Sequence, residues 1–207
     1  MIKLCGIKRR EDVMIVNEFL PEYIGMILSE GFRRTVDMNT AKELAKLLDK
    51  RIKKVGVFVN EPAENVRSAA ERLDLQVIQL HGDEDREYIR SLSVKCEIWK
   101  AVRVRSSEDI LSAEKLGCDR LLLDSFVKNA VGGTGIVADW DIIKNTNITL
   151  PYFLAGGIGE DNMAAALEIC PNIDLSGSVE TDGVKDREKV RRITELYRDL
   201  TQKGILI

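Results

Sequence analysis

An alternation of two kinds of segment runs along the whole chain and limits its fold more than any other feature. Short apolar runs of strand length are separated by longer segments of helical periodicity, and this pattern occurs eight times. The apolar runs are IKLCG (2–6), YIGMIL (23–28), KVGVFV (54–59), LQVIQLH (75–81), EIWKAV (97–102), RLLLDS (120–125), YFLAGG (152–157) and IDLSGS (173–178). Nearly unbroken rows of Val, Ile, Leu and aromatic residues are typical of strands buried on both faces of a parallel sheet.

The segments between these runs carry apolar residues at three- and four-residue intervals, which predicts amphipathic helices. The clearest are residues 41–50, 62–74, 161–169 and 186–200. Eight β-then-α units predict an α/β fold, a compact (βα)8 TIM barrel, with residues 1–207 as a single catalytic domain. An open doubly wound sheet has the same local pattern. It usually has fewer strands and a glycine fingerprint after the first one, and CGIKR is not such a fingerprint.

The composition excludes several classes of protein. With 44% hydrophobic and 31% charged residues and a net charge of -3, the chain has the balance of a soluble globular protein and no sign of a nucleic-acid surface. Its 207 residues can form one well-buried core and contain no visible linker. We find neither the apolar core of a signal peptide nor a spanning segment, so we expect a cytoplasmic protein without membrane contact.

Cysteine and histidine are too sparse to indicate a metal site. The four cysteines, Cys5, Cys96, Cys118 and Cys170, are far apart and form no C-x-x-C pair, and His81 is the single histidine. We therefore expect no metal and no redox motif. A lone cysteine in a cytosolic protein is usually a small buried apolar residue, so a chemical role for Cys5 needs evidence of its own.

Polar and reactive residues stand where the predicted strands end. The active site of a (βα)8 barrel lies at the carboxyl ends of its strands, so these residues are the first candidates for function. They are Cys5, His81, Asp124, the pair Gly156 and Gly157, and the turn Ser176, Gly177, Ser178. The same residue types are common in turns, so each one taken singly is ambiguous.

Two glycine-rich loops predict a phosphate site. AGGIGEDN (155–162) follows the seventh strand and SGSVETDG (176–183) follows the eighth. Barrels frequently bind phosphate with these two loops and a short extra helix, because glycines let backbone N–H groups approach the phosphate oxygens. We therefore expect a phosphorylated small-molecule substrate. The long loop 126–140, with Gly132, Gly133 and Gly135, is a candidate lid beside Asp124.

The order of these motifs resembles the phosphoribosylanthranilate isomerases of tryptophan biosynthesis. The similarity spans the chain through KLCGI, VGVFVN (55–60), QLHGDE (79–84), LLLDS (121–125), GGTG with DW (132–140), LAGGI (154–158) and DLSGSVETDGVKD (174–186). The resemblance implies an Amadori rearrangement, without a cofactor, of N-(5-phosphoribosyl)anthranilate into 1-(o-carboxyphenylamino)-1-deoxyribulose 5-phosphate.

The resemblance also implies roles for individual residues. The catalytic base falls on Cys5 and the general acid on Asp124. The arginine that binds the anthranilate falls on Arg34, with Arg33 as the neighbouring alternative. The phosphate contacts fall on Gly156, Gly157, Ser176, Gly177 and Ser178, and Asp174 should point toward the amine side of the substrate. His81 is a candidate substrate contact, although a lone histidine is more often structural.

Three parts of the sequence depart from the family's pattern. Residues 32–35 read Phe-Arg-Arg-Thr where the family has Ser-Pro-Arg-Tyr, so the anthranilate side of the pocket should differ in shape. Ser178 occupies the place of a glycine, which bears on the phosphate turn. Ala138 replaces a bulky aromatic residue.

The proposed chemistry sets a condition on protonation. Ordinary pKa values of about 8.5 for Cys and about 3.9 for Asp would leave the proton on Cys5 and not on Asp124 at neutral pH. If the two groups face each other across the barrel mouth, they resist holding two negative charges and share about one proton. The bound substrate's imminium charge would then favour the thiolate.

Other functions stay open at this point. Another phosphate-binding barrel, such as an indole-glycerol-phosphate lyase or the histidine-pathway isomerase, should differ at the first strand, where this chain has Cys5. A phosphate-ligand binding module without activity, and the use of a second aminoaldose, are further alternatives. The pattern is compatible with a monomer or a homodimer.

Overall fold

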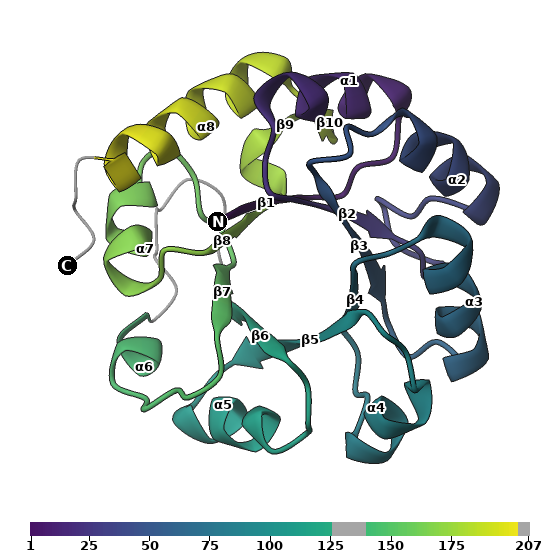
Figure 1. Cartoon of the computed structure of the whole chain (residues 1–207). Helices are drawn as coiled ribbons and strands as arrows, with labels where there is room; N and C mark the ends of the chain where they lie inside the picture. Colours follow the sequence, from purple (N-terminus) through teal and green to yellow (C-terminus); the bar gives the residue numbers. More distant parts are fainter. Residues whose placement is uncertain (126–139, 203–207) are drawn as a thin grey trace.

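The fold is a closed barrel of eight parallel strands. A computed structural model describes residues 1–125 and 140–202. The strands are Ile2–Cys5 (β1), Tyr23–Ile27 (β2), Lys53–Phe58 (β3), Val77–Leu80 (β4), Glu97–Val104 (β5), Arg120–Ser125 (β6), Tyr152–Ala155 (β7) and Ile173–Leu175 (β8). Each strand pairs with the next, and β1 pairs with β8, so the sheet closes on itself (Figure 1). This closure confirms the (βα)8 prediction and excludes an open sheet.

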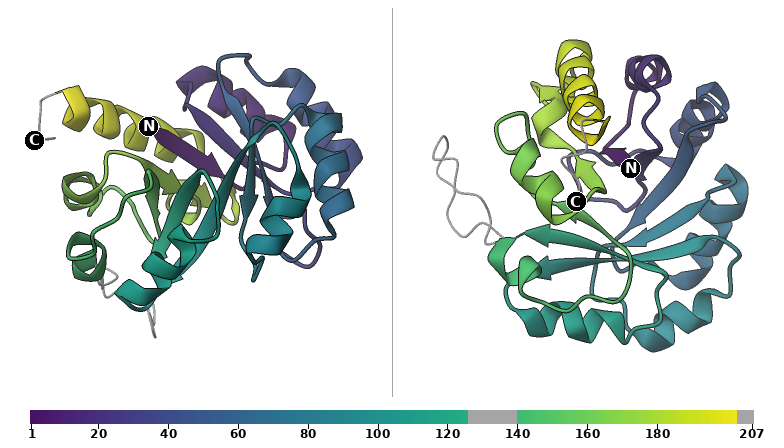
Figure 2. Two further views of the ribbon diagram at one scale, coloured as in Figure 1. Left: turned by 60° about the horizontal axis from the view of Figure 1, so that its bottom comes forward. Right: turned by 60° about the vertical axis from the view of Figure 1, so that its left-hand side comes forward.

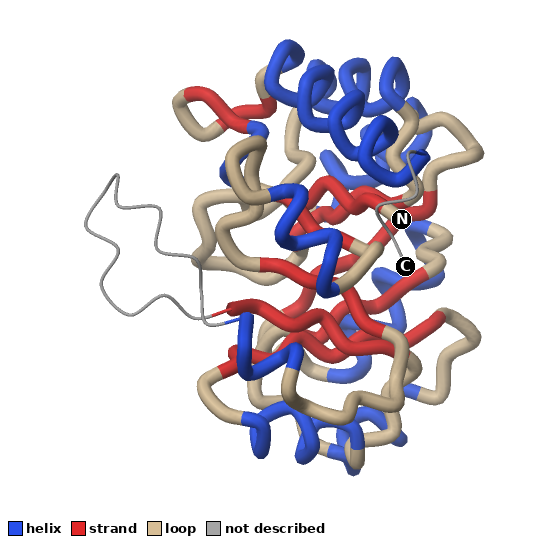
Figure 3. The backbone as a smooth tube through the Cα atoms, turned by 90° about the vertical axis from the view of Figure 1, so that its left-hand side faces the viewer, coloured by secondary structure: helices blue, strands red, loops and turns tan. Residues whose placement is uncertain are grey.

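The helices form a layer around the strands (Figure 1 and Figure 3). They are Arg10–Phe19 (α1), Met38–Leu47 (α2), Ala63–Leu73 (α3), Arg86–Leu92 (α4), Ser107–Glu114 (α5), Trp140–Lys144 (α6), Met163–Ile169 (α7) and Arg187–Gln202 (α8). The last helix, α8, packs between α7 and α1 (Figure 2). Within residues 1–125 and 140–202, no helix has both the length and the apolar character needed to cross a membrane.

The predicted elements are present, although the ends of several strands and helices differ from the predicted bounds. Two differences have a clear local cause. Helix α2 begins at Met38 and not at residue 41, because the Asp37 side chain caps it by accepting hydrogen bonds from the backbone N–H groups of Asn39 and Thr40. The sequence analysis also missed a small hairpin, Glu180–Thr181 (β9) with Val184–Lys185 (β10). Its turn is the Asp-Gly pair at 182 and 183, both with positive φ, which is a strong signal for a two-residue hairpin loop.

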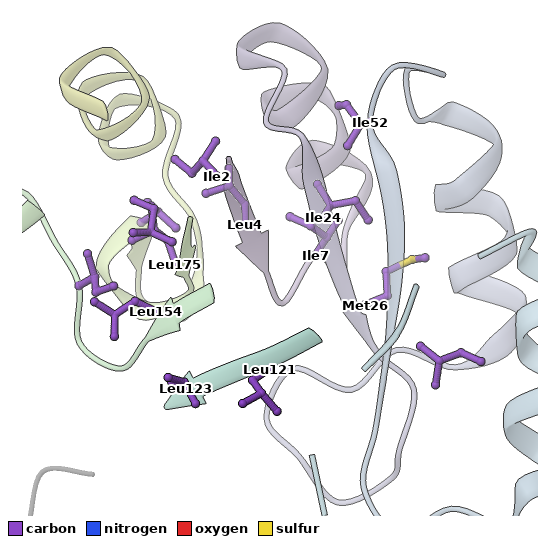
Figure 4. Packing of buried hydrophobic residues seen from close by; sticks show 14 of the residues in the cluster. Ile2, Leu4, Ile7, Ile24, Met26, Ile52, Leu121, Leu123, Leu154 and Leu175 are labelled. Carbon is purple, nitrogen blue, oxygen red and sulfur yellow. The ribbon is translucent and has the colours of Figure 1, made fainter. Parts of the chain in front are cut away.

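Side chains alternate between two buried layers. Leu4, Ile24 and Met26 point outward and pack in the layer between strands and helices (Figure 4). Residues one step along the chain, such as Cys5 and Tyr23, belong to the inner layer. This alternation follows from the two-residue period of a strand, and it places every second residue of β1 inside the barrel.

An aromatic cluster fills the barrel toward the amino ends of its strands. The rings of Tyr23, Trp99 and Phe153 pack together, with centroids 4.8 Å apart for Trp99 and Phe153 and 5.0 Å apart for Tyr23 and Trp99. The guanidinium of Arg120 lies over the Trp99 ring at 5.5 Å. This end of the barrel is therefore packed, which leaves the carboxyl ends of the strands for a site.

Candidate active site

A cavity of about 370 Å³ opens at the carboxyl ends of the strands. All ten residues predicted for the site line it: Cys5, Arg34, His81, Asp124, Gly156, Gly157, Asp174, Ser176, Gly177 and Ser178. Apolar side chains of Ile27, Val57 and Leu122 form part of its wall. Residues 126–139, which contain most of the predicted lid and Ala138, lie outside the described part of the chain.

Cys5 and Asp124 reach the cavity from strands far apart in the barrel. Cys5 ends β1 and is 8% exposed, whereas the Asp124 side chain near the end of β6 is 36% exposed. His81 stands beside Asp124, with Nε2 at 3.8 Å from Oδ2, and its Nδ1 lies 3.2 Å from the Nε2 atom of Gln79. The cavity thus brings a buried thiol and an accessible carboxyl group to one space, with an imidazole next to the carboxyl.

The charges around Cys5 work against each other. Burial raises the pKa of the Cys5 thiol above its ordinary value, and the positive charges of Lys3 and Lys185 lower it only in part. The negative charge of Asp174 raises it further. In the ligand-free protein Cys5 is therefore a protonated thiol at neutral pH, and a thiolate needs additional positive charge nearby.

Arg34 is held at the mouth of the cavity by a carboxylate that the sequence analysis missed. Its Nε and Nη2 atoms donate to the two carboxylate oxygens of Glu180, each at 2.7 Å. Lys185 donates to Glu180 at 2.8 Å, and Arg33 at 3.0 Å. Burial raises the pKa of Glu180, but the hydrogen bonds and charges of Arg34 and Lys185 outweigh it and lower the pKa to about 2.

The two arginines differ in exposure. The Arg34 side chain is 22% exposed and lines the cavity, whereas 61% of the Arg33 side chain is exposed. The bidentate contact with Glu180 also fixes the plane of the Arg34 guanidinium. These differences favour Arg34 over Arg33 as the group that meets a ligand in the cavity.

The glycine-rich loops lie side by side at the rim. Gly156 and Gly157 have φ angles of 91° and 67°, which side chains rarely allow. Asn162 braces this loop, since its Oδ1 accepts from Gly159 N at 2.8 Å and its Nδ2 donates to Gly157 O at 3.1 Å. No sequence motif indicated this role for Asn162.

The turn after β8 accommodates the serine that replaces a glycine. Gly177–Val179 forms a single 3-10 turn, and Ser178 is not among the described residues with positive φ, so its side chain causes no backbone strain. Its buried Oγ has no hydrogen-bond partner among residues 1–125 and 140–202. A buried hydroxyl without a partner is costly unless a ligand or water satisfies it.

A closed barrel whose open end gathers a thiol, two carboxyl groups, an imidazole and glycine-rich turns is the architecture of a barrel enzyme for a small polar substrate. Comparisons with known proteins narrow this class. A family model described as N-(5'-phosphoribosyl)anthranilate (PRA) isomerase matches residues 2–196. The N-(5'-phosphoribosyl)anthranilate isomerase of Caldanaerobacter subterraneus subsp. tengcongensis is 42% identical over 199 residues, covering 95% of this chain and 97% of the relative.

Solved structures agree with the sequence matches. The crystal structure of phosphoribosyl anthranilate isomerase from Thermotoga maritima superposes with a TM-score of 0.85 at 27% identity, covering 96% of this chain and 98% of the other. A complex of the enzyme with reduced 1-(o-carboxyphenylamino)-1-deoxyribulose 5-phosphate has a TM-score of 0.80 at 25% identity, with the same coverage. The chain belongs to the N-(5'-phosphoribosyl)anthranilate isomerase family, whose members are isomerases of tryptophan biosynthesis.

Proposed function

We propose that this chain converts N-(5-phosphoribosyl)anthranilate into 1-(o-carboxyphenylamino)-1-deoxyribulose 5-phosphate, with Cys5 as the base and Asp124 as the acid. The observation that carries the assignment of roles is the single cavity that Cys5 and Asp124 share with the glycine-rich turns after β7 and β8. Residues 1–207 act as one catalytic domain in this proposal. The family membership supports the reaction, and the cavity supports the residues.

The first step opens the ribose ring. The anthranilate nitrogen pushes its lone pair toward C1', a Schiff base forms, and the C1' bond to the ring oxygen breaks. The ring oxygen must gain a proton as this bond breaks, and Asp124, with 36% of its side chain exposed in the cavity, is placed to give it. His81, at 3.8 Å, can contact Asp124 or the freed hydroxyl.

The second step removes the hydrogen from C2'. Cys5 takes this proton as a thiolate, the electron pair moves toward the imminium nitrogen, and the resulting enolamine relaxes to the ketone. Because burial raises the pKa of the Cys5 thiol, the imminium charge formed in the first step is needed to favour the thiolate. One proton shared by Cys5 and Asp124 is enough for both steps: in the first it passes from the thiol to Asp124 and on to the ring oxygen, which leaves the thiolate, and in the second the C2' proton replaces it on Cys5.

The two ends of the substrate have separate anchors. The phosphate meets the backbone of Gly156 and Gly157 and the turn from Ser176 to Ser178, where the Ser178 Oγ, which has no partner among the described residues, can donate to an oxygen. The anthranilate carboxylate meets Arg34, whose Nη1 takes no part in the contact with Glu180. Asp174 also lines the cavity, and we assign it to the amine side of the substrate.

Fluorescence tests the proposal directly, because turnover consumes the anthranilate emission of the substrate. We expect Cys5→Ala and Asp124→Asn each to lower kcat by at least about two orders of magnitude, the usual contribution of an acid or base. Circular dichroism should show both variants folded. Near wild-type turnover in either variant would remove that residue from its role.

Matched variants control for loss of a thiol or a charge. Cys118→Ala removes a buried cysteine of the outer layer, and Asp199→Asn removes an exposed carboxylate of α8. Both should keep wild-type kcat. A folded wild-type chain that produced no emission change above the uncatalysed rate would instead support a binding module without activity.

A further inference from the structure

Beneath the cavity lies a lysine that the proposed mechanism leaves without a task. Lys3 is on β1, two residues before Cys5, so both side chains point into the barrel. Its side chain is 0% exposed, and its Nζ lies 2.9 Å from Oδ1 of Asp174 on β8. A buried ammonium is expensive to keep in a protein interior, so its place directly under the proposed base needs an explanation.

The backbone packing fixes Lys3 and Cys5 against the same glycine. Gly25 on β2 is the register partner of Cys5. A Cβ added at Gly25 would lie 2.8 Å from the Cys5 sulfur and 3.4 Å from Cε of Lys3. Because Gly25 has no side chain, the sulfur and the end of the lysine chain can both occupy this part of the barrel interior.

Lys3 is charged and interacts with both acidic neighbours. Burial lowers the pKa of Lys3, but the charges of Asp174 and Cys5 and hydrogen bonding to both outweigh burial and raise it above its ordinary value. The other charges that act on Cys5 are Lys185 of β10 and Arg34 of the loop after β2, while His81 and Asp124 face the same cavity from β4 and β6. Among the positive charges named for Cys5, that of Lys3 has the largest influence.

We propose that Lys3 is a positioning residue for Cys5: its buried ammonium, shared with Asp174, holds the sulfur in place and stabilises the thiolate that takes the C2' proton. This inference rests on the proposed role of Cys5 as the base. It assigns opposite effects to the two partners of the ion pair. Lys3 favours the Cys5 thiolate. Asp174 competes with Cys5 for the Lys3 ammonium and disfavours the thiolate.

Alkylation by iodoacetamide measures this effect without requiring catalysis, since only the thiolate displaces iodide to form the S–C bond. The full chain is alkylated and then digested, and mass spectrometry of the peptides follows Cys5 and Cys96 in the same sample. We expect Lys3→Met to slow alkylation of Cys5 at pH 8 by about tenfold or more, which corresponds to about one pKa unit. Asp174→Asn should speed it severalfold. Cys96, half-buried and outside the cavity, should react at the same rate in all proteins.

The two substitutions should change the alkylation rate of Cys5 in opposite directions, which separates an electrostatic role from simple disruption of the core. Equal Cys5 rates in Lys3→Met and wild type, or slower alkylation in Asp174→Asn, would overturn the proposal. If Lys3→Met does not fold, the alkylation rate of Cys5 in Asp174→Asn decides. The double variant Lys3→Met with Asp174→Asn removes both charges, and its Cys5 alkylation rate should lie between those of the single variants.

Enzyme kinetics then give a second readout. In Lys3→Met we expect kcat to fall with KM little changed, and the alkaline limb of kcat/KM to move to higher pH because the thiol holds its proton longer. Loss of activity in Cys5→Ala together with an unaltered Cys5 alkylation rate in Lys3→Met would refute the role of Lys3 and leave the proposed function intact. Full activity of Cys5→Ala would refute the proposed function, whatever the alkylation rates.

Discussion

The two ends of the barrel interior are formed by the same strands but are filled by different kinds of side chain. Toward the amino ends, Tyr23, Trp99 and Phe153 fill the space with stacked and tilted rings. Toward the carboxyl ends, the inward positions that line the cavity hold charged or reactive groups, including Cys5, Asp124 and Asp174, and the buried Lys3 pairs with Asp174. The aromatic end stabilises the fold by burying apolar surface, whereas the open end keeps polar groups that a purely stabilising core would exclude.

This difference shows where the fold accepts a cost in stability. The ion pair of Lys3 and Asp174 and that of Lys185 and Glu180 are both nearly removed from water. Buried pairs of this kind are often no more stabilising than apolar residues of the same size. Asp174 lines the cavity, and Glu180 contacts Arg34, which also lines it. Because the aromatic packing lies at the other end, we predict that substitutions at the two ends will separate stability from activity.

The largest effect on stability is expected from Trp99→Ala. Trp99 is fully buried and contacts both other rings, so its removal should lower the free energy of unfolding by about 3–5 kcal/mol, the usual cost of deleting a large aromatic side chain. Urea unfolding measures this loss. Activity per folded molecule should stay near wild type at low temperature. A large fall in kcat of the folded variant would show that the two ends are coupled.

The sequence predicted the fold well because the signals for it are local. Each apolar run is visible within a few residues, and the candidate residues Cys5, Asp124 and Ser176 could be located once strand ends were known. Lys3 was missed because its partner Asp174 is 171 positions away, and the pair forms only when β1 closes against β8. A lone lysine two residues before Cys5 within an apolar run was the available signal.

The anthranilate side of the cavity shows a second limit of the sequence. Neighbouring arginines at 33 and 34 look equivalent along the chain, and their different exposures come from the loop after β2. Glu180, which orients Arg34, lies in the β9–β10 hairpin. The sequence analysis missed this hairpin, although the Asp-Gly pair of its turn was a visible signal. Contacts between distant loops such as these depend on closure of the whole barrel.

The next largest effect is an increase in KM, which tests the different roles of Arg33 and Arg34. Arg34→Ala should raise KM by about 10- to 100-fold, since a hydrogen bond to a charged group contributes about 1.5–3 kcal/mol. Stability should change little, because Lys185 and Arg33 still pair with Glu180. Steady-state kinetics measure the change. Arg33→Ala is the matched control and should keep KM near wild type; the reverse ranking would assign the carboxylate to Arg33.

The smallest effect concerns the pH dependence of stability at the open end. Hydrogen bonds and charges of Arg34 and Lys185 overcome burial and lower the pKa of Glu180 from 4.5 to about 2. A carboxyl group whose folded pKa is lowered stabilises the fold above its unfolded pKa, and this contribution is lost as the pH falls through the folded pKa. The stability advantage of wild type over Glu180→Gln should therefore be complete above about pH 4.5 and shrink toward pH 2. We expect this pH-dependent part to be on the order of 1 kcal/mol, because solvent at the mouth screens the charges. Urea unfolding at several pH values measures it, with the exposed Glu188→Gln on α8 as control. A difference that stayed constant down to pH 2 would show that Glu180 contributes through packing, as the aromatic end does, and not through its charge.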